Sequence, residues 1–230
     1  MVRGYPDWQG VSKKVEATIR QNIIFPTGRV IFSDEFSTPS VTWRSVFAGA
    51  GTQEIVTINS FTPPGCVRLL TAATAGNYEG MYYEAGLPRS FKLGVEAAFC
   101  FADAVDTYLN IIVYWGKGNE TYSGKVRYSR TNKYWEYVNS VNVWTRLPGS
   151  DMNLQVWVNN YHRVKVIMDF SLKKYVSLQI DSYFIDMSDL NLRTITFPVN
   201  EGYYIELRAE TQANAAKTVY IDNLIITEEE

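Results

Sequence analysis

Residues 91–103, FKLGVEAAFCFAD, decide the fold class. Apolar side chains occupy every second position from Phe91 to Phe101, whereas Lys92 and Glu96 fall on the alternate positions. Side chains of a β-strand point alternately to the two faces of a sheet, so this period predicts a strand with one face in a core.

Similar alternation recurs along the rest of the chain. The segment 107–119, TYLNIIVYWGKGN, is apolar on both faces up to a Gly-Lys-Gly turn, which is typical of a central strand covered on both sides. The segment 126–138, VRYSRTNKYWEYV, predicts a hairpin around a polar turn. Further strands are expected within 162–170, 175–187, 203–211 and 218–227, and helical periodicity is nearly absent. We therefore predict an all-β fold, a jelly-roll β-sandwich of two antiparallel sheets.

A change in charge divides the chain into an N-terminal arm, residues 1–28, and a jelly-roll domain, residues 29–230. Residues 1–30 sum to +3 and the whole chain to -2, so the remainder sums to -5. Both a strand and a helix fit the pattern from Val11 to Arg20, and the choice stays open. The large apolar side chains of the arm are expected to pack on a neighbouring subunit, or back on their own sandwich. They are Tyr5, Trp8, Ile23, Ile24 and Phe25.

Composition excludes several classes of protein. With 22 Lys and Arg against 24 Asp and Glu, the chain lacks the basic excess of a protein that binds nucleic acid mainly through phosphates. No apolar run approaches the roughly 20 residues of a membrane span, and the first residues do not resemble a secretory signal. We expect neither a nucleic-acid nor a membrane partner.

The two cysteines, Cys66 and Cys100, are too few for a disulfide scaffold and too far apart in sequence for a typical zinc motif. Both are expected on the less buried side of their strands. One bridge is possible if those strands pair, but the lack of a secretory signal favours two free, half-buried thiols.

Residues 161–193, YHRVKVIMDFSLKKYVSLQIDSYFIDMSDLNLR, resemble a strand, hairpin and turn of concanavalin A-like lectin/glucanase domains. Residues 30–37, VIFSDEFS, and 219–227, VYIDNLIIT, resemble the first and last strands of the same jelly rolls. In addition, the layout of GYPDW at 4–8, a strand-like stretch and the jelly-roll opening is similar to virion proteins of tailed bacteriophages. This likeness implies a protein made in the host cytoplasm and located in the virion.

Catalytic residues are not expected. Sandwich glucanases carry Glu-x-Asp-x-x-Glu on one strand, but here Ala98 follows Glu96 and Arg208 follows Glu206 where the second acid would stand. The only histidine, His162, has no Gly-x-Ser-x-Gly nucleophile elbow to serve, so packing or exposure to solvent explains it better. We therefore predict that the protein is not an enzyme.

Aromatic side chains are the candidates for ligand binding, because sugars stack their apolar faces on exposed rings. Trp135 and Tyr137 share one face of their strand and Tyr134 the other, so one of these two sets can be exposed. Burial in a core or a subunit interface would explain the same pattern. The full candidate set is Trp115, Tyr134, Trp135, Tyr137 and Trp144.

A structural calcium ion is the one cofactor that the resemblance implies, because many jelly-roll modules hold one where the first and last strands meet. The matching residues are Asp34, Glu35 and Asp222. Alternatively, these side chains bond to the local backbone or are solvated.

These observations together predict a structural or interaction protein, a phage virion component in capsid decoration or associated with the tail. It would assemble through its arm, with copies of itself or with a larger particle. The alternative is a non-catalytic carbohydrate-binding module, stabilised by calcium.

Overall fold

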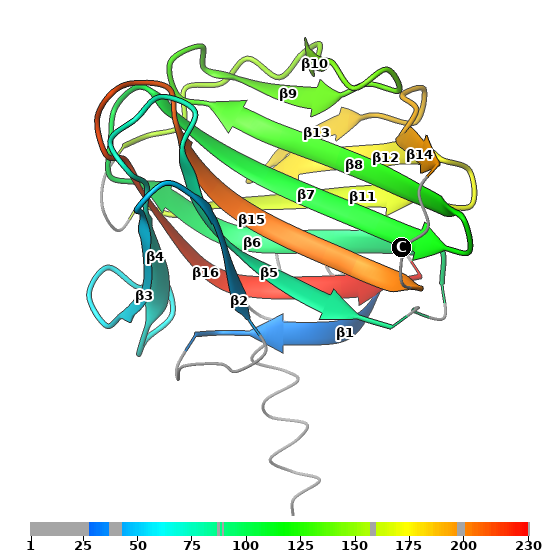
Figure 1. The fold of residues 1–230 in the computed structure, drawn as a ribbon, viewed down its shortest axis with the longest axis horizontal. Helices are drawn as coiled ribbons and strands as arrows, with labels where there is room; N and C mark the ends of the chain where they lie inside the picture. The colour runs from blue at the N-terminus through cyan, green and yellow to red at the C-terminus, as the bar shows by residue number, and fades with distance from the viewer. Residues whose placement is uncertain are drawn as a thin grey trace, which may run out of the picture.

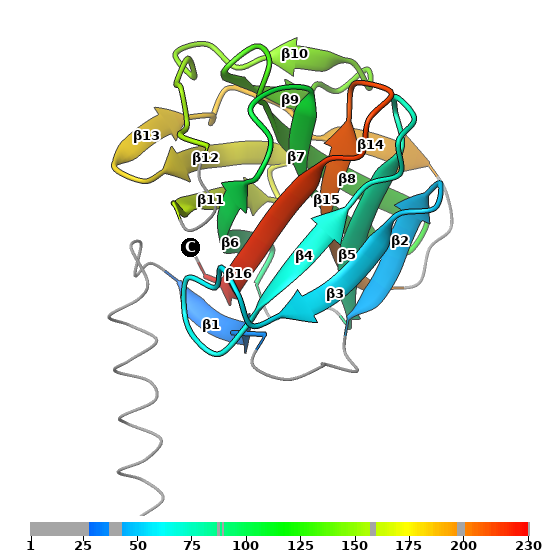
Figure 2. The same ribbon diagram turned by 90° about the vertical axis from the view of Figure 1, so that its left-hand side faces the viewer.

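The structure is a computed structural model, and it describes residues 28–36, 43–86, 88, 90–156, 160–196 and 201–229. These residues form sixteen strands and no helix. The strands make two antiparallel sheets packed face to face (Figures 1 and 2), so the predicted all-β jelly-roll sandwich is confirmed. No helix of the described part is long and apolar enough to cross a bilayer.

The first sheet has β6 and β16 at its centre. Its order is β13 (Tyr183–Asp186), β12 (Lys174–Ile180), β11 (His162–Asp169), β6 (Lys92–Phe101), β16 (Thr218–Glu228), β4 (Cys66–Leu70) and β3 (Thr52–Val56). β1 (Arg29–Asp34) pairs with the second half of β16. Strands from both ends of the described chain therefore meet in this sheet.

The second sheet lies in front of the first in Figure 1 and has β7 and β15 at its centre. Its order is β10 (Trp144–Arg146), β9 (Tyr134–Val138), β8 (Glu120–Ser129), β7 (Thr107–Lys117), β15 (Gly202–Thr211), β5 (Tyr78–Ala85) and β2 (Arg44–Ala48). β14 (Arg193–Thr196) pairs with the first half of β8.

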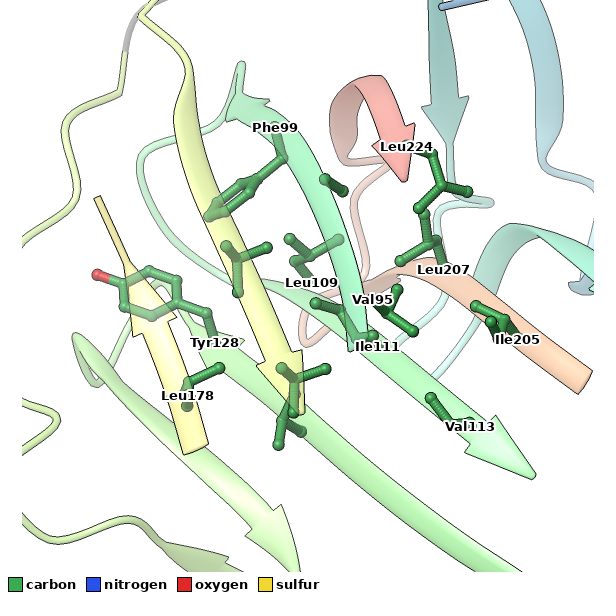
Figure 3. Close-up of a cluster of buried hydrophobic side chains, with 14 of the residues drawn as sticks. Val95, Phe99, Leu109, Ile111, Val113, Tyr128, Leu178, Ile205, Leu207 and Leu224 are labelled. Atoms are coloured by element: carbon green, nitrogen blue, oxygen red, sulfur yellow. The ribbon is translucent and has the colours of Figure 1, made fainter. Parts of the chain in front are cut away.

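The core fills the space between the sheets, as Figure 3 shows. The first sheet contributes Val95 and Phe99, and the second sheet contributes Leu109, Ile111 and Leu207. From Leu93 to Phe101, every second side chain points into this core and is at most 2% exposed. The period-2 pattern thus predicted both the strand and its buried face.

The two cysteines are fully buried and form no disulfide with each other, and the strands that carry them do not pair. β16 lies between β4 and β6, so the Cα atoms of Cys66 and Cys100 stand roughly 10 Å apart or more, beyond the reach of a disulfide. The predicted half-exposed position is wrong. Residues 57–65 cover this side of the sheet, and the Cys66 thiol donates a hydrogen bond to the carbonyl of Ile58 at 3.6 Å.

Candidate functional site

The outer face of the second sheet carries polar and aromatic side chains in rows that cross the strands. In the central row, Glu206 of β15 stands between Tyr82 of β5 and Ile112 of β7. Lys125 of β8 follows Ile112 in the same row. Because β15 and β7 are the middle strands of the sheet (Figure 1), Glu206 lies near the centre of the face.

Glu206 is 1% exposed although it points away from the core. Its carboxylate accepts a hydrogen bond from the Tyr204 hydroxyl at 3.3 Å and forms an ion pair with Arg208. A contacting guanidinium stabilises the charged form of a carboxyl group. Burial raises the pKa of Tyr204 to about 12, so this hydroxyl stays protonated near neutral pH.

A glycine makes room for Arg208. Gly80 is the partner of Arg208 across β5 and β15, and a Cβ there would lie 2.9 Å from the Arg208 Cγ and 2.5 Å from the Leu207 carbonyl. The guanidinium lies 4.0 Å from the centroid of the Tyr78 ring, which forms a cation–π contact. Arg208 is therefore held between a ring and the Glu206 carboxylate.

A second charged pair lies across the sheet on β8 and β9. Arg127 Nε donates to Glu136 Oε2 at 2.6 Å. The same guanidinium lies 3.9 Å from the centroid of Tyr108 and 4.1 Å from that of Trp144. The Arg127 guanidinium thus makes cation–π contacts with both rings, Tyr108 of β7 and Trp144 of β10.

Asn110 stands between Arg208 and Arg127 in the strand register and bonds to Glu210. The Asn110 amide donates to Glu210 Oε2 at 3.2 Å, and burial is the main reason why the pKa of Glu210 is raised. Asn110 is 2% exposed, so these groups are screened little by water. Twelve polar and aromatic residues of this face form what we call the outer-face site: Tyr78, Tyr82, Tyr108, Asn110, Tyr114, Arg127, Glu136, Trp144, Tyr204, Glu206, Arg208 and Glu210.

Two of the five aromatic residues predicted to bind ligand lie on this face. Trp144 belongs to the outer-face site, and Tyr134 lies beneath the guanidinium of Arg146, 4.9 Å from its ring centroid. Both are partly exposed. Alternation along β9 separated Tyr134 from Trp135, and the structure shows that the set containing Tyr134 faces outward.

The other three aromatic candidates face the core. Trp115 is 2% exposed and Trp135 is fully buried, and Tyr137 packs edge-on against Tyr175. The Trp115 ring stacks on Phe170 of the first sheet at a centroid distance of 5.2 Å. These side chains fill the sandwich, and their predicted role as exposed sugar platforms does not fit the structure.

Two of the three acids predicted to hold calcium, Asp34 and Asp222, accept hydrogen bonds from N–H groups. Asp34 accepts from the backbone of Phe36 at 2.7 Å and from the Trp43 indole at 2.8 Å. Asp222 accepts from the backbone N–H groups of Phe61 and Thr62, and burial raises its pKa to about 6.

In the described part of the chain, no group of three or more His, Cys, Asp or Glu is arranged to hold a metal ion. Calcium binding by Asp34, Glu35 and Asp222 stays a prediction. The arm residues Tyr5, Trp8, Ile23, Ile24 and Phe25 lie outside the described residues.

Most of the outer-face site was missed from the sequence. The segment 203–211, YYIELRAET, did carry a signal, because alternation groups Tyr204, Glu206, Arg208 and Glu210 on one face. Their neighbours on β5 and β7 come from distant parts of the chain, and only the pairing of the strands identifies them.

No protein-family model matches the chain, and no curated protein matches it. Solved structures do. A Bacillus subtilis protein of unknown function with a galectin-like fold aligns at a TM-score of 0.57 and 11% identity, over 87% of this chain and 96% of that one. An endo-β-1,4-glucuronan lyase from the fungus Trichoderma reesei aligns at 0.54 and 13%, again over 87% and 96%. The carbohydrate esterase vb_24B_21 of the Shiga toxin-encoding bacteriophage phi24B aligns at 0.52 and 16%, over 88% and 100%.

The chain has the concanavalin A-like jelly-roll fold. The resemblance seen in residues 161–193 is therefore confirmed, and one protein of similar structure comes from a phage. The prediction of a protein that is not an enzyme is corrected. Carbohydrate-active enzymes use this fold, since a lyase and an esterase share it over 87% and 88% of this chain.

Proposed function

We propose that this jelly-roll domain binds a carbohydrate chain across the outer face of its second sheet and acts on it at Glu206. The observation that carries the proposal is the position of Glu206, a carboxylate that is 1% exposed at the centre of a face rich in aromatic rings. Rings on such a face can stack on sugars, and a shielded carboxylate can transfer protons. The lyase and esterase of similar structure support the same class of substrate.

Neither Glu210 nor Glu136 is placed to serve with Glu206 in the hydrolysis of a glycosidic bond by two carboxylates. That reaction uses carboxyl groups about 5 to 9 Å apart. Glu206 and Glu210 are four residues apart on one strand, so their Cα atoms are separated by about 13 Å. Glu136 lies three strands away from Glu206. A single carboxylate beside the Tyr204 hydroxyl suits a reaction that needs one base, such as an elimination or the cleavage of an ester.

The test is an assay of binding and product release on a panel of neutral, acidic and acetylated polysaccharides. Glu206→Gln keeps the shape of the side chain and removes its charge, so we expect substrate binding to persist while turnover falls at least 100-fold. Glu54→Gln is the matched control, because Glu54 is an exposed acid on β3 of the other sheet. Full turnover in Glu206→Gln, or no binding to any polysaccharide, would contradict the proposal.

A second proposal concerns location. We propose that the protein is carried on a phage particle, where its arm attaches it to neighbouring subunits. The phage esterase of similar structure supports this, because proteins with this fold do occur in phages. Light scattering after size exclusion would compare the full chain with a chain that begins at Arg29. An oligomer that becomes a monomer without the arm is expected, whereas monomers in both samples would refute assembly through the arm.

A further inference from the structure

Strands β2 and β3 connect the two sheets at one edge of the sandwich. β2 pairs with β5 in the second sheet, whereas β3 pairs with β4 in the first sheet. Each is the last strand of its sheet, and the two lie side by side in Figure 2. We call residues 44–56, which comprise β2, the turn at 49–51 and β3, the bridging segment.

Glu79 of β5 packs against the bridging segment from the core side of its strand. Its partner on β15, Ala209, is fully buried in the core, and its partner on β2 is Phe47. A Cβ at Gly51 would lie 2.7 Å from Oε2 of Glu79, so the carboxyl group lies directly against the backbone of the segment. Only 2% of the Glu79 surface is exposed. The bridging segment therefore shields this carboxyl group from water.

The Glu79 carboxyl group is buried without compensation. In the part of the chain that the structure describes, no donor and no cation bonds to it, and burial raises its pKa to about 6. An ionised carboxylate in such a place is unfavourable, because it loses hydration and gains no partner.

The charged side chains of the strands around Glu79 lie on other surfaces. Arg68 of β4 forms an ion pair with Glu54 of β3 on the outer side of the first sheet. Those of β2, β5 and β15 lie on the outer face of the second sheet, on the opposite side of their strands from Glu79: Arg44, Glu84, Arg208 and Glu210. Glu79 is thus the acid whose ionisation acts on the packing between the sheets at this edge.

We propose that the bridging segment is a pH-sensitive closure, which stays packed on Glu79 while this carboxyl group is protonated and opens locally when it is ionised. Opening returns the carboxylate to water and so restores the hydration that burial removes. The closed state holds the proton more tightly than the open state, in which the pKa has its ordinary value of 4.5. Closure is therefore tightest in acid and weakens as pH rises from about 4.5 to about 6.

The opening would reach the outer-face site through β2. The Arg44 guanidinium lies 6.0 Å from the centroid of the Tyr82 ring, so movement of β2 takes this cation away from the ring. The inference does not depend on the proposed function, because local opening is measured without a ligand.

Hydrogen–deuterium exchange of the full chain, resolved by mass spectrometry, would measure the opening at half-unit steps from pH 4 to pH 7. Rates are corrected for the intrinsic pH dependence of amide exchange. We expect the protection of residues 44–56 to fall about tenfold or more between pH 4.5 and pH 6.5, and to end below that of β6. Constant protection would overturn the proposal. So would protection equal to that of β6 at every pH, since the segment would then open only with the whole fold.

Variants of Glu79 identify the group that titrates. Glu79→Gln keeps the shape of the side chain without its charge, so residues 44–56 should stay protected up to pH 7. Glu79→Met, which is unbranched and apolar, repeats the test in case the amide fits the site poorly. Glu84→Gln is the matched control, because Glu84 is an exposed acid on the same strand and acts on Arg44 of β2. The pH dependence should persist in this control. Its persistence in both Glu79 variants, or its loss in Glu84→Gln, would refute the role of Glu79.

Discussion

The carboxylate of Asp222 accepts a hydrogen bond from the backbone N–H of Phe61 at 2.8 Å, although 161 residues separate the two in the chain. The same oxygen accepts from Thr62, and the Asn223 amide donates to the Thr62 hydroxyl at 2.6 Å. The Tyr161 hydroxyl holds the same segment by donating to the Asn59 carbonyl. Residues 57–65 are thus bonded to the outer side of the first sheet, over the buried thiol of Cys66.

Replacing Asp222 by alanine should detach this segment. The change removes the acceptor of two partly buried N–H groups, so we expect the free energy of unfolding to fall by about 1–3 kcal/mol. Urea denaturation measures it. Glu54→Ala, which removes an exposed ion pair with Arg68, should cost less than about 1 kcal/mol. Equal losses in the two variants would show that the bonds of Asp222 do not hold the segment.

Two buried acids should make the free energy of unfolding decrease as the pH rises. Burial raises the pKa of both Asp222 and Glu79 to about 6. Between about pH 4 and pH 6 the folded state therefore binds more protons than the unfolded state, and these two acids make stability fall as pH rises through that window.

Urea midpoints at half-unit steps of pH would test this dependence. Acids with a lowered pKa, such as Asp181, act in the opposite sense and at lower pH, so they do not mask the effect. In Asp222→Asn the decrease from pH 4 to pH 6 should be smaller than in the parent protein. A rise in stability over that window would contradict the assignment.

Gly80→Ala should disturb the centre of the outer-face site. The added methyl group would lie 2.5 Å from the Leu207 carbonyl, so β5 and β15 must separate locally and Arg208 must move. We expect a loss of about 1–3 kcal/mol in unfolding free energy, together with weaker glycan binding. Thermal melting and binding isotherms measure the two effects. Gly76→Ala is a control for backbone strain alone, because a Cβ at Gly76 meets nothing within 4 Å and its φ is +83°. Unchanged glycan binding in Gly80→Ala would argue against a role for Arg208.

Trp144→Ala should weaken glycan binding about tenfold or more, because it removes one ring of the outer face and frees the Arg127 guanidinium. The fold should persist, since Trp144 lies outside the core and on the short edge strand β10. Phe184→Ala provides the comparison, as Phe184 is an aromatic side chain that is 66% exposed on β13 of the first sheet. If both variants bind glycan equally well, Trp144 is not a contact.

Sequence patterns predicted the positions of the strands well, but they did not always show which face of a strand is buried. Alternation from Leu93 to Phe101 identified β6 and its buried face, because burial on one side leaves a period of two. In β9 the same period divided Tyr134 from Trp135 without showing which faces the core. That choice depends on the sheet behind the strand, which local sequence does not contain.

The functional site was harder to predict for the same reason. In the sequence, Glu206 matches only one position of a two-acid motif, and the absence of the second acid argues against catalysis. Its neighbours Tyr82 and Ile112 lie about 120 and 90 residues earlier in the chain, and they become neighbours only through strand pairing. The burial of Cys66 likewise depends on residues 57–65 folding over the sheet.

The place of β16 has a consequence for biosynthesis. This strand, Thr218–Glu228, pairs with β1, β4 and β6, so until it follows β4 and β6 each keep one open edge and β1 lacks its partner in the sheet. The ribosome releases residues at about 5–20 per second, so β4 and β6 wait for several seconds with apolar faces and open edges. Newly made chains of this protein are therefore natural clients for chaperones, and a nonsense mutation before Thr218 would yield a product that cannot complete its first sheet.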